Sequence, residues 1–159
     1  MGAIEQKKDE FENALMPPVY RVQLVRESSV ERTSLDSPTD AARVLCRYLE
    51  NEDREHFVTL MLDVKNRIIG LHTVSIGTLN CAIISAREVF KAAILANAAS
   101  VILAHNHPSG DLTPSPEDIQ VTQSLKAAGK LLDIEVIDHI IVGEGGAHNS
   151  MKQGGLAGF

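Results

Sequence analysis

The sequence predicts a single α/β domain. Segments in which apolar residues recur with helical spacing alternate with short apolar runs typical of strands. The 159 residues suit one globular domain, and 44% of them are hydrophobic, which is enough for a core. The expected division is a polar N-terminal segment with one strand over 1–35, the domain over 36–150, and a flexible tail over 151–159.

Strands are expected wherever apolar residues alternate with polar ones or form short runs. Residues 19–27 alternate, which is typical of a half-exposed strand. The further candidate strands are 56–63, 67–77, 81–85, 100–104 and 134–143. A turn over 63–67 would join two of them as a hairpin. The glycine-rich residues 143–159 predict loop or frayed coil.

Three segments carry signals that begin a helix. Ser37 is a candidate N-cap before a proline. Ser85 and Glu88 have the spacing of a capping box, and the helix that follows is apolar nearly all round, which predicts burial. Ser115 begins the third helix, and we expect Gly129 to end it.

Composition and charge exclude several classes of protein. With 15 basic and 21 acidic residues the formal charge is −6, which argues against strong direct binding of nucleic acid. No apolar run approaches the roughly 20 residues that span a membrane, and the N-terminus lacks a signal-peptide core. Cys46 and Cys81 are expected as buried thiols in a reducing, cytoplasmic compartment. Any metal ion would therefore be held by histidines and carboxylates.

The segment that carries chemistry lies between residues 105 and 118. His105 and His107 stand at i and i+2 at the end of an apolar strand, so their side chains share a face, with Cα atoms roughly 7 Å apart. Imidazoles at that spacing can converge on one zinc ion. Asp118, in the first turn of the next helix, is a natural third ligand. This set leaves a fourth coordination position open for water, as catalytic zinc requires.

Each of these residues also has a structural explanation. Ser115 and Asp118 are the residues that a helix start favours, whatever the function. A histidine at a strand end is commonly a hydrogen-bonded polar residue and nothing more. The combination of all four positions, rather than any one of them, favours a metal site.

The remaining candidates give weaker signals. We interpret His56 and His72 as structural or surface residues. We interpret Asp138 and His139 as a polar pair in the sheet. The alternative is that they hydrogen-bond to a metal ligand without contacting the metal themselves. Cys81 lacks the surroundings that activate a nucleophile, so we assign it to the core.

The pattern His105-x-His107-Pro108, followed by Ser115-x-x-Asp118, resembles the JAMM motif of JAB/MPN metalloproteases. Glu55, in DREHFVTLMLD, occupies the place of the upstream glutamate of that motif. Roughly over residues 36–150, the segments EHFVTLMLD, SAREVFKAAILANAASVILAHNHPSGDLTPSPEDIQVT and DHIIVG are similar to the RadC-like branch. Full-length RadC proteins also carry a helix-hairpin-helix region, and this chain resembles a short form without it.

The resemblance implies a fold and a set of roles. The fold would be a curved mixed sheet of about six strands with helices on both sides, layered as in cytidine deaminases. His105, His107 and Asp118 would bind Zn²⁺. Glu55 would act as the general base, and Ser115 would hydrogen-bond the attacking water or the oxyanion.

The leading functional expectation is a zinc-dependent metallohydrolase that cleaves a peptide or isopeptide bond. Family members act on ubiquitin-like proteins or peptide tails, while the pattern identifies neither a physiological substrate nor an oligomeric state. The alternative is a DNA-repair or mobile-element accessory protein, acting as a metal-binding interaction module or as a nuclease. One His₂Asp zinc suits a nuclease less well than a two-metal cluster. A nucleobase deaminase is excluded because the H-x-E and P-C-x-x-C ligands are missing.

Overall fold

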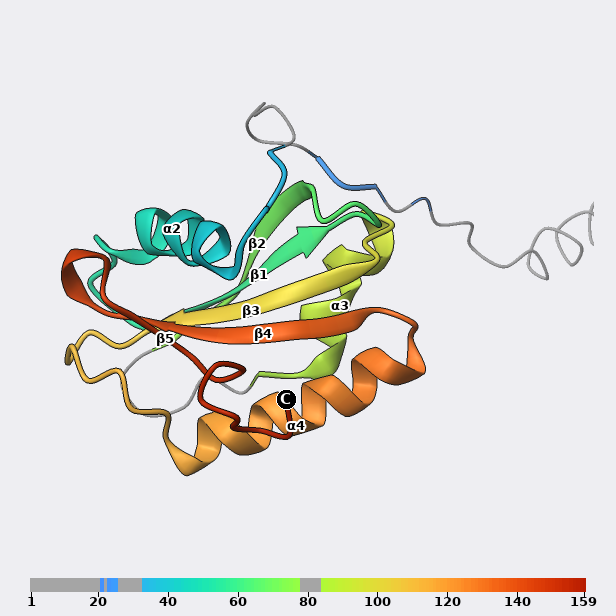
Figure 1. The fold of residues 1–159 in the computed structure, drawn as a ribbon. Helices are drawn as coiled ribbons and strands as arrows, with labels where there is room; N and C mark the ends of the chain where they lie inside the picture. The colour runs from blue at the N-terminus through green and yellow to red at the C-terminus, as the bar shows by residue number, and fades with distance from the viewer. Residues whose placement is uncertain (1–20, 22, 26–32, 78–83) are drawn as a thin grey trace, which may run out of the picture.

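The computed structural model describes residues 21, 23–25, 33–77 and 84–159. These residues form one mixed five-stranded sheet with helices on both faces, so the α/β prediction is confirmed (Figure 1). The sheet order is β2-β1-β3-β4-β5. Only β3 and β4 pair in parallel; the other neighbours are antiparallel. The strands are β1 (His56–Leu62), β2 (Ile68–Ile76), β3 (Ser100–Asn106), β4 (Glu135–Val142) and β5 (His148–Ser150).

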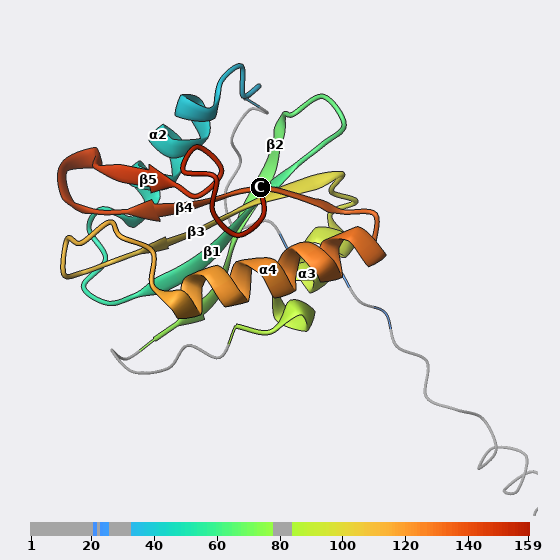
Figure 2. The same cartoon turned by 60° about the horizontal axis from the view of Figure 1, so that its bottom comes forward.

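The helices bury the two faces of the sheet in two separate apolar clusters. Helix α2 (Pro38–Leu49) packs on one face, while α3 (Ala86–Leu95) and α4 (Pro116–Leu131) pack on the other (Figures 1 and 2). Every residue of β1 and β3 is buried, as expected of central strands covered on both sides. No helix in the described part of the chain is long and apolar enough to cross a membrane.

The three predicted helix starts differ in their hydrogen bonds. At Ser115 the full capping box forms with Asp118. At Ser85 only half of the box forms, because the Glu88 carboxylate pairs with Lys91 at 2.6 Å. Ser37 makes no side-chain cap, since its hydroxyl donates to the Asp40 carboxylate instead.

The prediction that Gly129 ends α4 is wrong. The helix continues to Leu131, and the left-handed residue that follows it is Asp133, with φ of 55°. A Cβ at position 129 would lie 2.4 Å from the carbonyl oxygen of Ile134. Gly129 therefore permits the close approach of α4 to the segment that enters β4.

The C-terminal segment is more structured than its glycine content predicts. Residues 148–150 form β5, after the short 3₁₀ helix η1 (Glu144–Gly146), so the expectation of loop or coil is wrong there. The last nine residues form turns in which Met151 and Ala157 are buried. The Lys126 ammonium donates to the carbonyl oxygens of Ala157 and Gly158, which ties these turns to α4.

Two predicted strands fall partly outside the described residues. Most of 19–27 lies there, and its described members, Arg21 and 23–25, form no strand. Residues 81–83 of the expected strand 81–85, Cys81 included, also lie outside. The hairpin prediction is confirmed by the antiparallel pairing of β1 with β2.

Candidate metal centre

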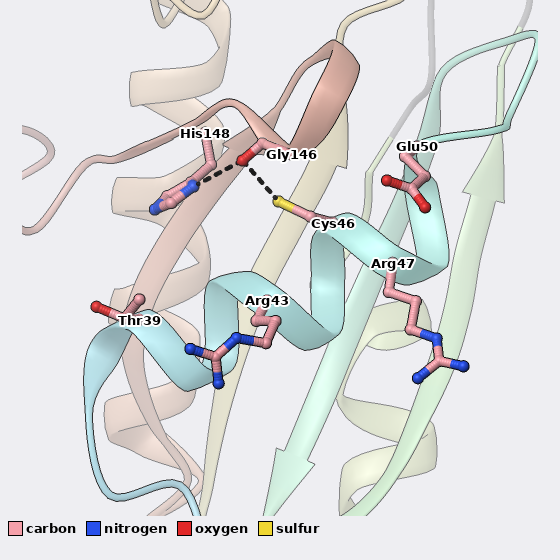
Figure 3. A pocket seen from close by; sticks show the side chains of 7 residues that line it. All are labelled: Thr39, Arg43, Cys46, Arg47, Glu50, Gly146 and His148. Carbon is pink, nitrogen blue, oxygen red and sulfur yellow. Dashed lines mark hydrogen bonds between the residues drawn. The ribbon is translucent and has the colours of Figure 1, made fainter.

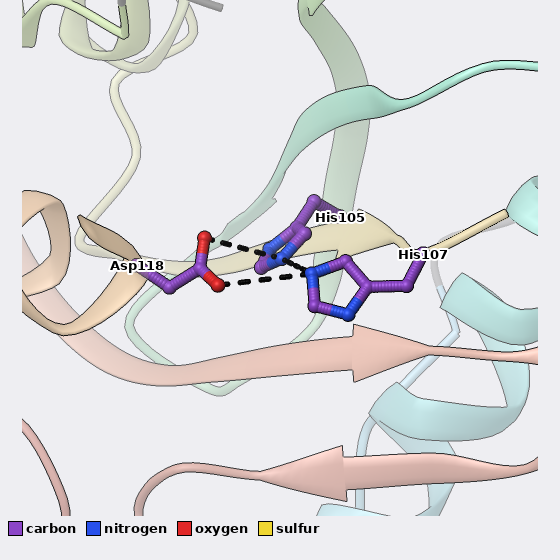
Figure 4. Close-up of side chains that lie close together, drawn as sticks. All are labelled: His105, His107 and Asp118. Atoms are coloured by element: carbon purple, nitrogen blue, oxygen red, sulfur yellow. Dashed lines mark hydrogen bonds and ion pairs between the residues drawn. The ribbon is translucent and has the colours of Figure 1, made fainter. Parts of the chain in front are cut away.

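The antiparallel pairing of β1 and β3 assembles the candidate site. Because Phe57 is paired with His105, the start of β1 lies beside the end of β3. His105 is the penultimate residue of β3, and His107 follows the strand. Helix α4 then brings Asp118, in its first turn, against both imidazoles (Figure 4).

The geometry of these three side chains suits one metal ion. The Nε2 atoms of His105 and His107 are 2.9 Å apart. The Asp118 carboxylate lies 3.4 Å from Nε2 of His105 and 3.7 Å from Nε2 of His107. A tetrahedral ion with ligand bonds of about 2.0–2.1 Å separates its ligand atoms by roughly 3.3 Å. The three predicted ligands therefore could hold a metal ion.

The second nitrogen of each imidazole is already hydrogen-bonded, which leaves both Nε2 atoms facing the centre. Nδ1 of His107 donates to the carbonyl oxygen of Asp111, and Nδ1 of His105 faces His139 at 2.8 Å. Hydrogen bonding to Asp118 raises the pKa of His107, and the negative charge of Glu55 adds a smaller contribution. Metal ligands in proteins are commonly oriented by such outer hydrogen bonds.

The capping box fixes the third ligand and its charge. Both the backbone N–H and the hydroxyl of Ser115 donate to Oδ2 of Asp118, at 2.8 and 2.7 Å. Burial acts to raise the pKa of Asp118, but hydrogen bonds from His105, His107 and Ser115 hold it well below its usual range. Asp118 is thus ionised and available as a candidate ligand, and Ser115 positions it.

His139 lies next to the candidate ligand His105, a position that the sequence pattern allowed but did not favour. A bulge between β3 and β4 pairs Val101 with Val136 but Ile102 with Asp138, so Ile137 is an extra residue. The bulge puts His139 on the face of His105. Burial there lowers the pKa of His139 well below the ordinary value. The preferred interpretation of a sheet polar pair was therefore wrong for His139. Only the adjacent acidic residue in the sequence hinted at this role.

Glu55 lies immediately before β1. The register of β1 and β3 ends at the pair Phe57 and His105, so Glu55 and His107 both lie just beyond it, and the negative charge of Glu55 contributes to raising the pKa of His107. The Asn106 side chain holds this segment in place, since it accepts from His56 N–H at 2.7 Å and donates to the Arg54 carbonyl at 2.9 Å. Both backbone groups that flank Glu55 are therefore tied to β3.

A cleft of about 250 Å³ adjoins His107. Its walls include Asn106 and Pro108, together with four carboxylates, and none of the described residues in them is a lysine or arginine. The carboxylates belong to Glu50, Glu52, Asp53 and Glu144. Leu49 and Val142 of its walls belong to the apolar cluster under α2, so the cleft opens on the α2 side of the sheet and meets the candidate site at His107.

A second cavity, of about 330 Å³, lies over α2 (Figure 3). Arg43 and Arg47 line it together with His148, and the buried Cys46 thiol lies 3.6 Å from the Gly146 carbonyl oxygen. Burial, and then the charge of Glu50, raises the pKa of this thiol. Cys46 is therefore a buried thiol, as predicted.

The fold and the site together define an α/β domain of the JAB/MPN type with a candidate His₂Asp metal centre. The family model of the RadC-like JAB domain matches residues 35–156, so the chain belongs to the RadC family.

Curated relatives carry the name UPF0758 protein. One from Chloroflexus aggregans is 50% identical over 133 residues, and one from Caldanaerobacter subterraneus is 48% identical over 136. A relative from Shouchella clausii is 49% identical over 131 residues. These alignments cover 84%, 86% and 82% of this chain but 58%, 58% and 56% of the relatives. The chain thus spans less than two thirds of their length.

Proposed function

We propose that this domain is a zinc-dependent hydrolase that cleaves a peptide or isopeptide bond by attack of water. The observation that carries the proposal is the convergence of His105 Nε2, His107 Nε2 and the Asp118 carboxylate. Glu55 comes just before β1, and its charge acts on His107. Three protein ligands with an open fourth position are the arrangement of catalytic zinc sites. Zinc bound there would lower the pKa of a water molecule and polarise the scissile carbonyl.

In this proposal Glu55 transfers protons, while Ser115 positions Asp118 and can bind the oxyanion. Glu55 accepts the proton of the attacking water and returns it to the leaving amine. It can do so because it lies at the site without belonging to the ligand set. Ser115 holds Asp118 through its hydroxyl, and when that hydroxyl turns from the carboxylate it can donate to the oxyanion.

The acidic cleft beside His107 supports a polypeptide substrate with basic side chains. Four carboxylates line the cleft, and they would favour positive charge in a bound segment that extends from His107 toward α2. The partner we propose is therefore a peptide or a ubiquitin-like protein whose cleaved segment carries lysine or arginine. The unpaired Cys46 thiol is consistent with a reducing, cytoplasmic setting.

Metal analysis and a peptide-library assay on the purified chain test the proposal. We expect about one zinc per chain, lost in His107→Ala and Asp118→Ala because each removes a ligand. Glu55→Gln should keep the zinc and lose roughly 10²–10⁴-fold in hydrolysis. Glu117→Gln is the matched control, since it neutralises an exposed carboxylate in the first turn of α4. It should keep both zinc and activity.

Two outcomes would overturn the proposal. Folded wild-type protein without zinc affinity would remove the metal centre. Equal hydrolysis by wild type and Glu55→Gln would show that Glu55 is not the base.

A further inference from the structure

A chain of buried hydrogen bonds begins at one candidate ligand and ends at another. Nδ1 of His105 lies 2.8 Å from Nε2 of His139. Nδ1 of His139 lies 2.5 Å from the Thr122 hydroxyl, which lies 2.6 Å from the carbonyl oxygen of Asp118. The side chains thus connect β3, β4 and α4 behind the candidate metal centre.

The donors and acceptors in this chain can be assigned by counting protons. Thr122 stands four residues after Asp118, and a helical threonine commonly donates its single hydroxyl proton to the carbonyl four residues earlier. Its oxygen then accepts from Nδ1–H of His139. Nε2 of His139, now without a proton, accepts from Nδ1–H of His105. In this assignment each N–H and O–H of the hydrogen-bonded series donates to one acceptor.

The opposite arrangement is incompatible with metal binding. If Thr122 donated to His139, Nε2–H of His139 would donate to His105. Nε2 of His105 would then carry a hydrogen directed at Asp118 and would have no lone pair for a metal. The direction of the Thr122 hydroxyl therefore matters for ligation.

We propose that His139 and Thr122 are positioning residues that hold His105 as its Nδ1-protonated tautomer and present its Nε2 lone pair to the metal ion. The inference rests on the metal centre of the proposed function. It concerns residues that touch neither substrate nor metal and act only through His105.

Because these side chains are buried, a water molecule cannot easily replace a lost hydrogen-bond partner among them. His105, His139 and Thr122 are each 0% exposed. The ring of Phe57 stacks on His105 and meets His139 edge-on, which closes the space beside the pair. Without the hydroxyl, the partner of His139 would be lost, and no water would take its place.

Threonine-to-valine exchanges provide a test that nearly preserves shape. Thr122→Val removes the hydroxyl, and Thr122→Ser retains it. The matched control is Thr59→Val in β1, since Thr59 is also 0% exposed and its hydroxyl has no hydrogen-bond partner among the described residues. Zinc dissociation constants are measured on metal-free protein by competition with a chromogenic chelator. Circular dichroism of each variant verifies that it is folded.

We expect Thr122→Val to weaken zinc binding by about 10–100-fold, as losses of outer hydrogen bonds do. Thr122→Ser should bind within about threefold of wild type, and Thr59→Val should equal wild type, on the same scale. The inference fails if Thr122→Val binds as tightly as wild type, or if Thr59→Val loses as much. A wild type that binds no zinc overturns the proposed function as well, so the two failures are distinguishable.

Nitrogen-15 NMR of labelled histidines gives an independent measurement on the zinc-loaded wild type, whether or not Thr122→Val folds. We expect protons on Nδ1 of both His105 and His139, with His105 Nε2 shifted by the metal. A proton on Nε2 of His139 would overturn the assignment.

Discussion

Asn106 lies between the two candidate histidine ligands, and its truncation should destabilise the domain. Asn106→Ala removes the acceptor of His56 N–H and the donor to the Arg54 carbonyl. His56 is 8% exposed, so its N–H would remain unpaired, at a cost of roughly 1–3 kcal/mol. Arg54 is exposed and its carbonyl can be hydrated, so only the net worth of a hydrogen bond, about 1 kcal/mol, is lost there.

The free energy of unfolding should therefore fall by about 2–4 kcal/mol. Urea unfolding of the metal-free protein, followed by circular dichroism because the chain has no tryptophan, measures this difference. Asn149→Ala is the matched control, since within the described residues the Asn149 side chain makes one hydrogen bond, to the Leu112 carbonyl at 2.9 Å. It should lose only about 1 kcal/mol.

Asn106→Ala should affect zinc binding and hydrolysis differently, because the candidate ligands and the proposed base are held by different contacts. Zinc stoichiometry should be retained in Asn106→Ala, because His105 and His107 are positioned by their own backbone and ring hydrogen bonds. Hydrolysis should fall, because the segment that carries Glu55 is released. A loss of stability below about 1 kcal/mol, or no greater than that of Asn149→Ala, would refute the bracing role of Asn106.

Two further predictions concern stability away from the metal centre. Gly129→Ala should destabilise the domain by about 1–3 kcal/mol in urea unfolding, although alanine has the better helix propensity, because the new Cβ meets the Ile134 oxygen. Gly70→Ala is the control and should be neutral or stabilising, since its new Cβ has no contact nearer than 3.5 Å. Equal effects of the two substitutions on the free energy of unfolding would contradict the packing argument. Hydrogen bonds from Arg67 lower the pKa of Asp63 to about 2, so the stability it contributes is present above pH 4 and is lost as the pH falls toward 2. Asp63→Asn should be less stable than wild type at pH 6, with the difference narrowing steadily as the pH falls from 4 toward 2, and a pH-independent difference would contradict the linkage.

The sequence predicted those parts of the site that depend on local spacing. His105 and His107 share a face because of strand alternation, and Asp118 lies in the first turn because Ser115 caps the helix. The helices on both faces of the sheet were implied by the family resemblance, whereas the β1–β2 hairpin followed from two apolar runs joined by a turn. Such features need only a few neighbouring residues to be specified.

The parts that the sequence did not predict depend on contacts between distant segments. Gly129 resembles a helix end, yet its role is to admit the Ile134 carbonyl, which only the packed structure brings close. The β5 strand has just three residues and becomes a strand only because β4 offers its edge. The position of His139 depends on a bulge that leaves no mark in the periodicity of β4.

That bulge also bears on how such a site can arise or disappear. Deleting Ile137 would restore the regular register and turn His139 to the opposite face, while all the ligands and His139 itself remained in the sequence. A comparison of chains by residue identity alone would score the deletion as a single gap and every motif residue as present. In this chain, the number of residues between the start of β4 and His139 therefore matters to the surroundings of the candidate metal centre as much as the identities of the motif residues do.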